Sequence, residues 1–221
     1  MPRSQKRRPG LSERFLLGLS QSRLVDGFWI GSLLTGANPV LTNQRVEDAL
    51  TIIRQYDAGR YQRLRRDLRR VWVRLQTGGN TGRYNVALDA CELDPRYILR
   101  DNVTPSDIAS VIVHEATHAK LCRYGIESAE SLRSRLEAAC RKQERAFAEH
   151  LPLPQRDKIM DKLRRMDQVP EDFWSDPSSA QRDQAGTDEA LVYLGVPRWL
   201  LPVSRLTRAV VGLIRRLIRS I

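Results

Sequence analysis

The chain has 221 residues, of which 41% are hydrophobic and 29% are charged, and its formal net charge is +11. This composition supports a hydrophobic core and excludes a collagen-like, low-complexity or wholly disordered chain. No apolar run is long enough to predict a membrane-spanning helix. The three scattered cysteines, Cys91, Cys122 and Cys140, predict reduced thiols in a cytoplasmic protein rather than a disulfide framework. Cys122 and Cys140 are expected to be small buried apolar residues.

The positive charge is concentrated in three segments. Residues 1–10 carry four basic side chains, residues 54–70 carry seven arginines against two aspartates, and residues 198–221 carry six arginines and no acid. The remainder of the chain is net negative, so the basic character is local. This distribution is compatible with an anionic membrane surface or nucleic acid at defined places, and equally with solvated helix faces.

The first 42 residues form a basic and apolar N-terminal segment. Its apolar stretch is interrupted by polar residues and lacks a small-residue cleavage site, which argues against a signal peptide. We expect one or two short helices there, packed on the body or lying on a membrane.

The next part of the chain predicts two helices and a small sheet. Apolar spacing over residues 43–70 is helical, with a break near Asp57. Residues 71–75 then read as a strand, and the turn-rich residues 77–82 lead into a returning strand over 84–93. Residues 97–99 are expected to add a short third strand.

The clearest helix start follows at Thr104. A capping hydroxyl, a proline at the first helical position and Asp107 at the third predict a helix that begins there and ends at Gly125. Further helices are expected over 128–150, 155–166 and 187–195, with a polar loop through 176–179.

This well-capped helix contains the run His114-Glu115-Ala116-Thr117-His118, which is the HExxH signature of zinc peptidases. Four residues advance an α-helix by about 6 Å and slightly more than one turn. The two imidazoles therefore project from one face and can share one tetrahedral zinc ion. Glu115 lies about 100° around the helix, where it can act as general base toward a metal-activated water.

The motif resembles the active-site helix of the zincin metallopeptidases, particularly the gluzincins, which include thermolysin-like and aminopeptidase-N-like enzymes. Those enzymes take a third zinc ligand from a glutamate on the next helix, eighteen residues after the motif in the aminopeptidase branch. Eighteen residues separate His118 from Glu137 here. The residues around Glu137 differ from the family pattern: position 136 is Leu where the aminopeptidases have Asn, and position 141 is Arg where thermolysin-like enzymes carry an acid. The chain therefore resembles the clan and not an enzyme of known specificity. It is similar to an uncharacterised bacterial metallopeptidase-like protein.

Other side chains compete with Glu137 for the third ligand position. Glu130 and Glu144 lie one heptad on either side of Glu137, roughly on the same helical face. Either could bind the ion or accept a hydrogen bond from a ligand imidazole. His150 would instead complete a three-histidine site.

Two further features have a role if the resemblance holds. In zincins an edge strand beside the active-site helix pairs with extended substrate, and residues 84–94 are the candidate here. Tyr193 could polarise the scissile carbonyl, or it could be a core residue.

Together these patterns predict an α+β, helix-rich, zincin-like domain over residues 43–195, with a small β-hairpin or sheet before the HExxH helix. The expected function is zinc-dependent hydrolysis of peptide bonds in a peptide or protein substrate, with Glu115 as base and with His114, His118 and Glu137 as ligands. The alternatives are a non-enzymatic zinc protein associated with membrane or nucleic acid, and a zinc protease recruited to DNA.

Residues 196–221 predict a basic amphipathic helix. Leucine, isoleucine and valine recur along one stripe, arginines fill the remainder, and no acid is present. Such a helix fits the interface of an anionic membrane. It equally fits docking on the body of the protein or on a second copy.

Overall fold

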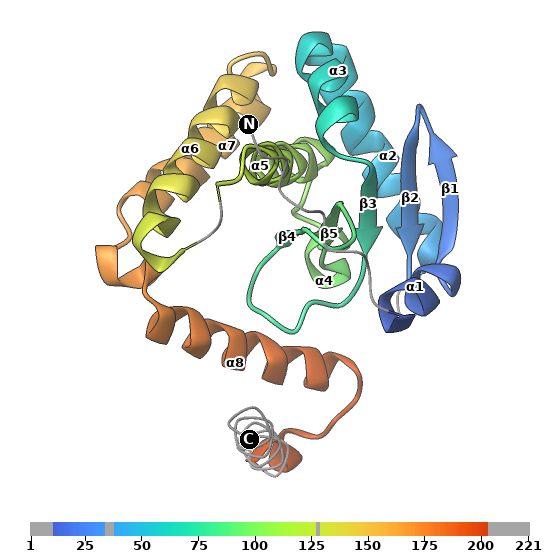
Figure 1. The fold of residues 1–221 in the computed structure, drawn as a ribbon, viewed down its shortest axis with the longest axis vertical. Coiled ribbons are helices and arrows are strands. Elements are labelled where there is room, and N and C mark those ends of the chain that lie inside the picture. The colour runs from blue at the N-terminus through green and yellow to red at the C-terminus, as the bar shows by residue number, and fades with distance from the viewer. Residues whose placement is uncertain (1–10, 34–37, 127–128, 203–221) are drawn as a thin grey trace.

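The computed structural model describes residues 11–33, 38–126 and 129–202. Helices dominate, and they pack against one five-stranded mixed sheet whose outer strand β1 lies at the edge of the molecule, which confirms the expected α+β, helix-rich class (Figure 1). The helices are α1 (Leu11–Gly18), α2 (Pro39–Tyr56), α3 (Ala58–Asp67), α4 (Pro95–Ile98), α5 (Pro105–Arg123), α6 (Glu130–Ala148), α7 (Leu153–Asp167) and α8 (Asp176–Tyr193), with 3₁₀ turns η1 (Glu171–Trp174) and η2 (Arg198–Leu200). The strands are β1 (Gln21–Val25), β2 (Phe28–Ser32), β3 (Arg70–Val73), β4 (Gly82–Asn85) and β5 (Ala90–Leu93).

The sheet has the strand order β1-β2-β3-β5-β4. Strands β2, β3 and β5 are parallel, whereas β1 and β4 run antiparallel to their neighbours. Val71 of β3 pairs with Ile30 on one side and with Cys91 on the other. β4 is therefore an edge strand, and it is the edge that packs against α5.

Alternation along β3 divides the core between the two faces of the sheet. Val71 and Val73 are buried in the main core cluster with side chains of α2 and α5. Trp72 points to the opposite face, where it packs with Leu16 and Leu17 of α1. Its indole N–H donates to the Ser20 hydroxyl at 2.9 Å, so this large side chain is buried without an unpaired donor.

The N-terminal expectation was only partly right. α1 is a helix, but the apolar stretch after it forms the β1–β2 hairpin instead of a second helix. Asp26 and Gly27 make the two-residue turn with φ of 48° and 86°, which is the backbone that Asp-Gly favours in tight hairpins. Phe28 and Ile30 belong to the main core. Residues of the expected 1–42 segment therefore pack within the same sheet and core as residues after 43.

Two predictions about the central strands were wrong. Residues 71–75 and 84–93 do not form a hairpin, because β3 pairs in parallel with β5 and the returning segment is split into β4 and β5. The expected strand at 97–99 is instead the end of α4. Asp94 caps this helix by accepting from the backbone N–H of Arg96, and Pro95 occupies its first position, so a helix starts directly after β5 where a third strand was expected.

The helical predictions after Thr104 hold for α5, α6 and α7, whereas the helix expected over 187–195 begins eleven residues earlier, at Asp176, as α8. α5, α6 and α7 lie within a few residues of their expected bounds, and the break at Asp57 separates α2 from α3. The Thr104 and Asp107 side chains form a capping box at the start of α5. The expected polar loop at 176–179 is instead the first turn of α8, capped by the Ser175 hydroxyl.

α5 is the central helix of the molecule. Residues 106–113 are all buried, because α5 packs against α2 and α6 and against β4 and β5 at once. β4 comes so close that a Cβ on Gly82 would lie 2.5 Å from Cγ1 of Val111 and 3.4 Å from the side chain of Glu115. A glycine at this position lets the edge strand lie directly on the helix.

The predictions for the two basic chain ends fall largely on residues that the structure does not describe. Residues 1–10 and the part of the expected C-terminal helix from 203 onward lie outside the described residues. Among the described helices, none is both long and apolar enough to cross a bilayer.

The contact at Gly82 predicts a specific sensitivity. Gly82→Ala should lower the free energy of unfolding by about 1–3 kcal/mol, because Val111 is stiff and buried and cannot give way to a new methyl group. Gly18→Ala is the matched control, since a Cβ there meets nothing within 4 Å. Urea denaturation of both variants measures the difference. Equal stability of the two would contradict the close approach of β4 to α5.

Candidate metal centre

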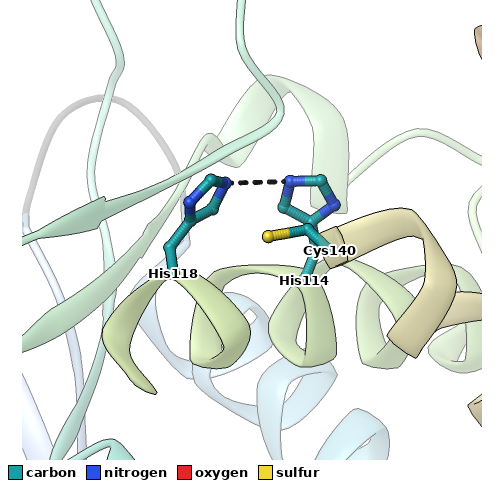
Figure 2. A group of neighbouring side chains, drawn as sticks. All are labelled: His114, His118 and Cys140. Carbon is teal, nitrogen blue, oxygen red and sulfur yellow. Dashed lines mark hydrogen bonds between the residues drawn. The ribbon is translucent and has the colours of Figure 1, made fainter. Parts of the chain in front are cut away.

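The two motif histidines stand one turn apart on α5 and face the same space. Nε2 of His114 and Nε2 of His118 are 3.2 Å apart. Figure 2 shows both rings projecting from the same side of the helix, with Cys140 of α6 beside them. The i, i+4 spacing predicted from the sequence therefore gives two imidazole nitrogens that face each other closely.

α6 adds the carboxylate of Glu137 to this pair. Its Oε2 lies 3.2 Å from Nε2 of His114, and its Oε1 lies 3.3 Å from Nε2 of His118. Ligands of a tetrahedral zinc ion with bonds of 2.0–2.1 Å are separated by about 3.3–3.4 Å. The donor separations therefore fit a single small cation, and both histidines approach it through Nε2.

Cys140 also reaches this group. Its sulfur lies within 4.8 Å of ligand atoms of His114 and His118, and the residue is completely buried. These three residues could hold a metal ion. Cys140 was expected only as a small buried apolar residue. It is buried, but its neighbours are polar, and its place three residues after Glu137 on α6 is the signal that could have indicated this.

Glu144 orients the first histidine from the other side. His114 Nδ1 lies 2.6 Å from Oε1 of Glu144, and the Ser110 hydroxyl donates to Oε2 at 2.6 Å. Lys162 lies 3.6 Å from the same Oε2. Because the carboxylate accepts from Nδ1, the tautomer of His114 is fixed and Nε2 is left for the group formed with Glu137.

Three carboxylates, those of Glu115, Glu137 and Glu144, lie around the two histidines. Burial by itself lowers the pKa of His114, but its hydrogen bonds with Glu137 and Glu144 outweigh burial and raise that pKa to about 10. Burial raises the pKa of Glu137 and Glu144, yet the hydrogen bonds from the histidines keep both pKa values below the usual range. The environment of His114 therefore favours positive charge at its imidazole, whether a proton or a metal cation.

The side chain of Glu115, a residue of α5, lies against the edge strand β4. It is 6% exposed, and burial, the largest effect, raises its pKa above the usual value. A hydrogen bond from the backbone of Tyr84 in β4 acts in the opposite direction. Glu115 thus contacts the strand on one side and has the two histidines as its charged neighbours on the other.

The remaining sequence candidates lie elsewhere. Glu130 accepts from the backbone N–H of Asp176 at 2.8 Å and so joins α6 to the start of α8. His150 is half exposed, with Nε2 3.9 Å from a carboxylate oxygen of Asp57. Tyr193 lines a surface cavity of about 500 Å³ with Arg96 and Leu99, and neither His114 nor His118 lines it.

The arginine-rich stretch over residues 54–70 is largely paired within the molecule. Arg60 forms an ion pair with Asp57 at 2.8 Å, and Arg54 forms one with Asp26 at 2.9 Å. Arg66 and Arg69 lie within 4 Å of further aspartates. Intramolecular carboxylates therefore neutralise much of this positive charge.

Comparisons with known proteins leave the site to be interpreted from its own geometry. No protein-family model matches the chain, and no curated protein or solved structure gives a significant match to it.

Proposed function

We propose that this protein is a zinc-dependent hydrolase of peptide bonds with a zincin-like site of the gluzincin type. The observation that carries the proposal is the position of the Glu137 carboxylate, 3.2 and 3.3 Å from the Nε2 atoms of His114 and His118. Two histidines and a glutamate form a known ligand set of catalytic zinc, which leaves a fourth position for water or substrate.

Each residue has a distinct task in this proposal. His114, His118 and Glu137 bind zinc, which supplies a positive charge that polarises a peptide carbonyl and acidifies water. Glu115 accepts a proton from that water and later donates it to the leaving amine. Glu144 holds the ring of His114 in place, and its own bonds to Ser110 and Lys162 keep it fixed.

The surroundings support a peptide as substrate. β4 is the edge of the sheet, and it lies against α5 beside Glu115. An edge strand can offer backbone groups to an extended peptide, which gives affinity with little dependence on side chains; in β4 the Tyr84 backbone already donates to Glu115, so a peptide would pair with the other backbone groups of the strand. We take β4 as the substrate-binding part of the expected 84–94 segment.

A second function is favoured by Cys140, which could complete a four-ligand site and leave no room for water. The chain would then be a non-enzymatic zinc protein. Three further proposals are separate from the metal site. Residues 196–221 would contact an anionic membrane, residues 54–70 would contact nucleic acid, and the protein would be cytoplasmic. The internal ion pairs of residues 54–70 weaken the case for nucleic acid.

The ligand assignment predicts a selective loss of metal. The purified protein should hold about one zinc ion per chain, and Glu137→Gln should lose most of it because the amide is a much weaker donor. Glu149→Gln is the matched control, because this exposed residue at the end of the same helix lies outside the group. Metal analysis of dialysed protein decides the matter, and full zinc content in Glu137→Gln would remove this residue from the site.

The position of Glu144 predicts a weaker effect of a different kind. Glu144→Gln should bind zinc about 10–100-fold less tightly, because the ring of His114 loses its charged acceptor. Competition with a chelating zinc indicator measures the affinity. Glu149→Gln again serves as control, and an affinity equal to that of wild type would show that Glu144 has no orienting role.

The role of Glu115 predicts that catalysis and binding can be separated. Glu115→Gln should retain zinc while hydrolysis of peptide substrates falls by about 10²–10⁴-fold, since the variant keeps the shape but loses the base. A peptidase screen of the zinc-loaded wild type identifies a substrate on which both proteins are then compared. Unchanged turnover in a variant with full zinc content would exclude Glu115 from the mechanism.

A further inference from the structure

Cys140 occupies an unusual place for a packing residue. It is completely buried, and its sulfur lies within 4.8 Å of ligand atoms of two imidazoles. Figure 2 shows the sulfur pointing from α6 toward the two rings. Glu137 comes from the same face of α6, three residues earlier, so one face of one helix presents a carboxylate and a thiol to the same small space.

The coordination number of zinc gives this position a consequence. His114, His118 and Glu137 supply three ligands, which suffice to hold a catalytic ion. A fourth protein ligand closes the tetrahedron and excludes water. In a tetrahedral site with bonds of about 2.3 Å to sulfur and 2.0–2.1 Å to nitrogen, the sulfur and a nitrogen lie about 3.6 Å apart. The sulfur of Cys140 lies within 4.8 Å of the histidine ligand atoms, so binding requires it to move closer by about 1 Å at most.

We propose that Cys140 is a displaceable fourth ligand, which holds the centre closed until a substrate or another ligand replaces it. The inference rests on the proposed function, because it requires the ion bound by His114, His118 and Glu137. When the sulfur binds, the S–H proton is released to solvent. When the sulfur is displaced, the thiolate takes up a proton again, so the exchange requires no oxidant or reductant.

The ligand set explains why the Cys140 thiolate can leave the ion. Three of the four ligands remain when the thiolate leaves, so the ion stays bound while one position opens. A thiolate favours soft and borderline metals over hard cations such as Mg²⁺. The resting centre is therefore expected to select a thiophilic ion.

Cobalt substitution tests this directly in the full chain. Co²⁺ replaces zinc in such sites, and a bound thiolate gives a charge-transfer absorption band in the near ultraviolet that nitrogen and oxygen ligands do not give. We expect the band in wild type and in the matched control Cys122→Ser. Cys140→Ser and Cys140→Ala should lose it while still binding one cobalt ion per chain, with circular dichroism reporting that each variant is folded.

Displacement is measured on the wild-type protein itself. Saturating acetohydroxamate, a bidentate oxygen ligand, should abolish the band while cobalt stays bound after gel filtration. A cobalt-loaded wild type without the band, a band that persists in Cys140→Ala, or a band that survives acetohydroxamate would overturn the inference and leave the three-ligand site intact. If the wild type binds no cobalt and no zinc, the proposed function fails together with it.

Discussion

The packing of α6 on α5 is the contact on which the site depends. α5 alone brings two imidazoles together, as any helix with histidines at i and i+4 does. The remaining polar groups at those rings come from one face of α6, where Glu137, Cys140 and Glu144 follow one another at spacings of three and four residues. A shift between the two helices would therefore alter the whole set at once. The burial of residues 106–113 of α5 opposes such a shift.

Electrostatics explains why this polar group is tolerated inside the molecule. Buried carboxylates are costly unless they are paired and hydrogen-bonded. Each one here has partners: Glu137 faces both histidines, Glu144 has His114, Ser110 and Lys162, and Glu115 has the backbone of β4. Three carboxylates, Glu115, Glu137 and Glu144, face three basic groups, His114, His118 and Lys162, but a neutral imidazole leaves their negative charge unbalanced. A bound divalent cation would balance that charge more fully than a proton on His114 does.

The sequence predicted those parts of the structure that depend on local signals. The Thr104–Asp107 box, the break at Asp57 and the pair His114 and His118 are each readable within a few residues, and the structure has each of them. The parallel pairing of β3 with β5 was missed because strand partners are chosen by long-range packing. Asp26-Gly27 and Asp94-Pro95 are also local signals, for the β1–β2 turn and the start of α4, but helices were expected around the first and a strand after the second. The facing of Cys140 and Glu144 toward His114 depends on how α6 rotates against α5, which periodicity alone does not fix.

The close approach of β4 to α5 is a second contact through which the fold positions a residue of the site. Without a side chain at Gly82, the edge strand lies against Val111 and reaches the carboxylate of Glu115 through the backbone of Tyr84. The same strand that would align an extended substrate thus also fixes the group that would move the proton. A peptide paired along β4 has its backbone placed relative to Glu115 by the strand register, since successive backbone groups repeat at fixed intervals along a strand. Precision at the reacting bond would then come from the main chain, so side-chain specificity would have to come from residues other than the backbone of β4.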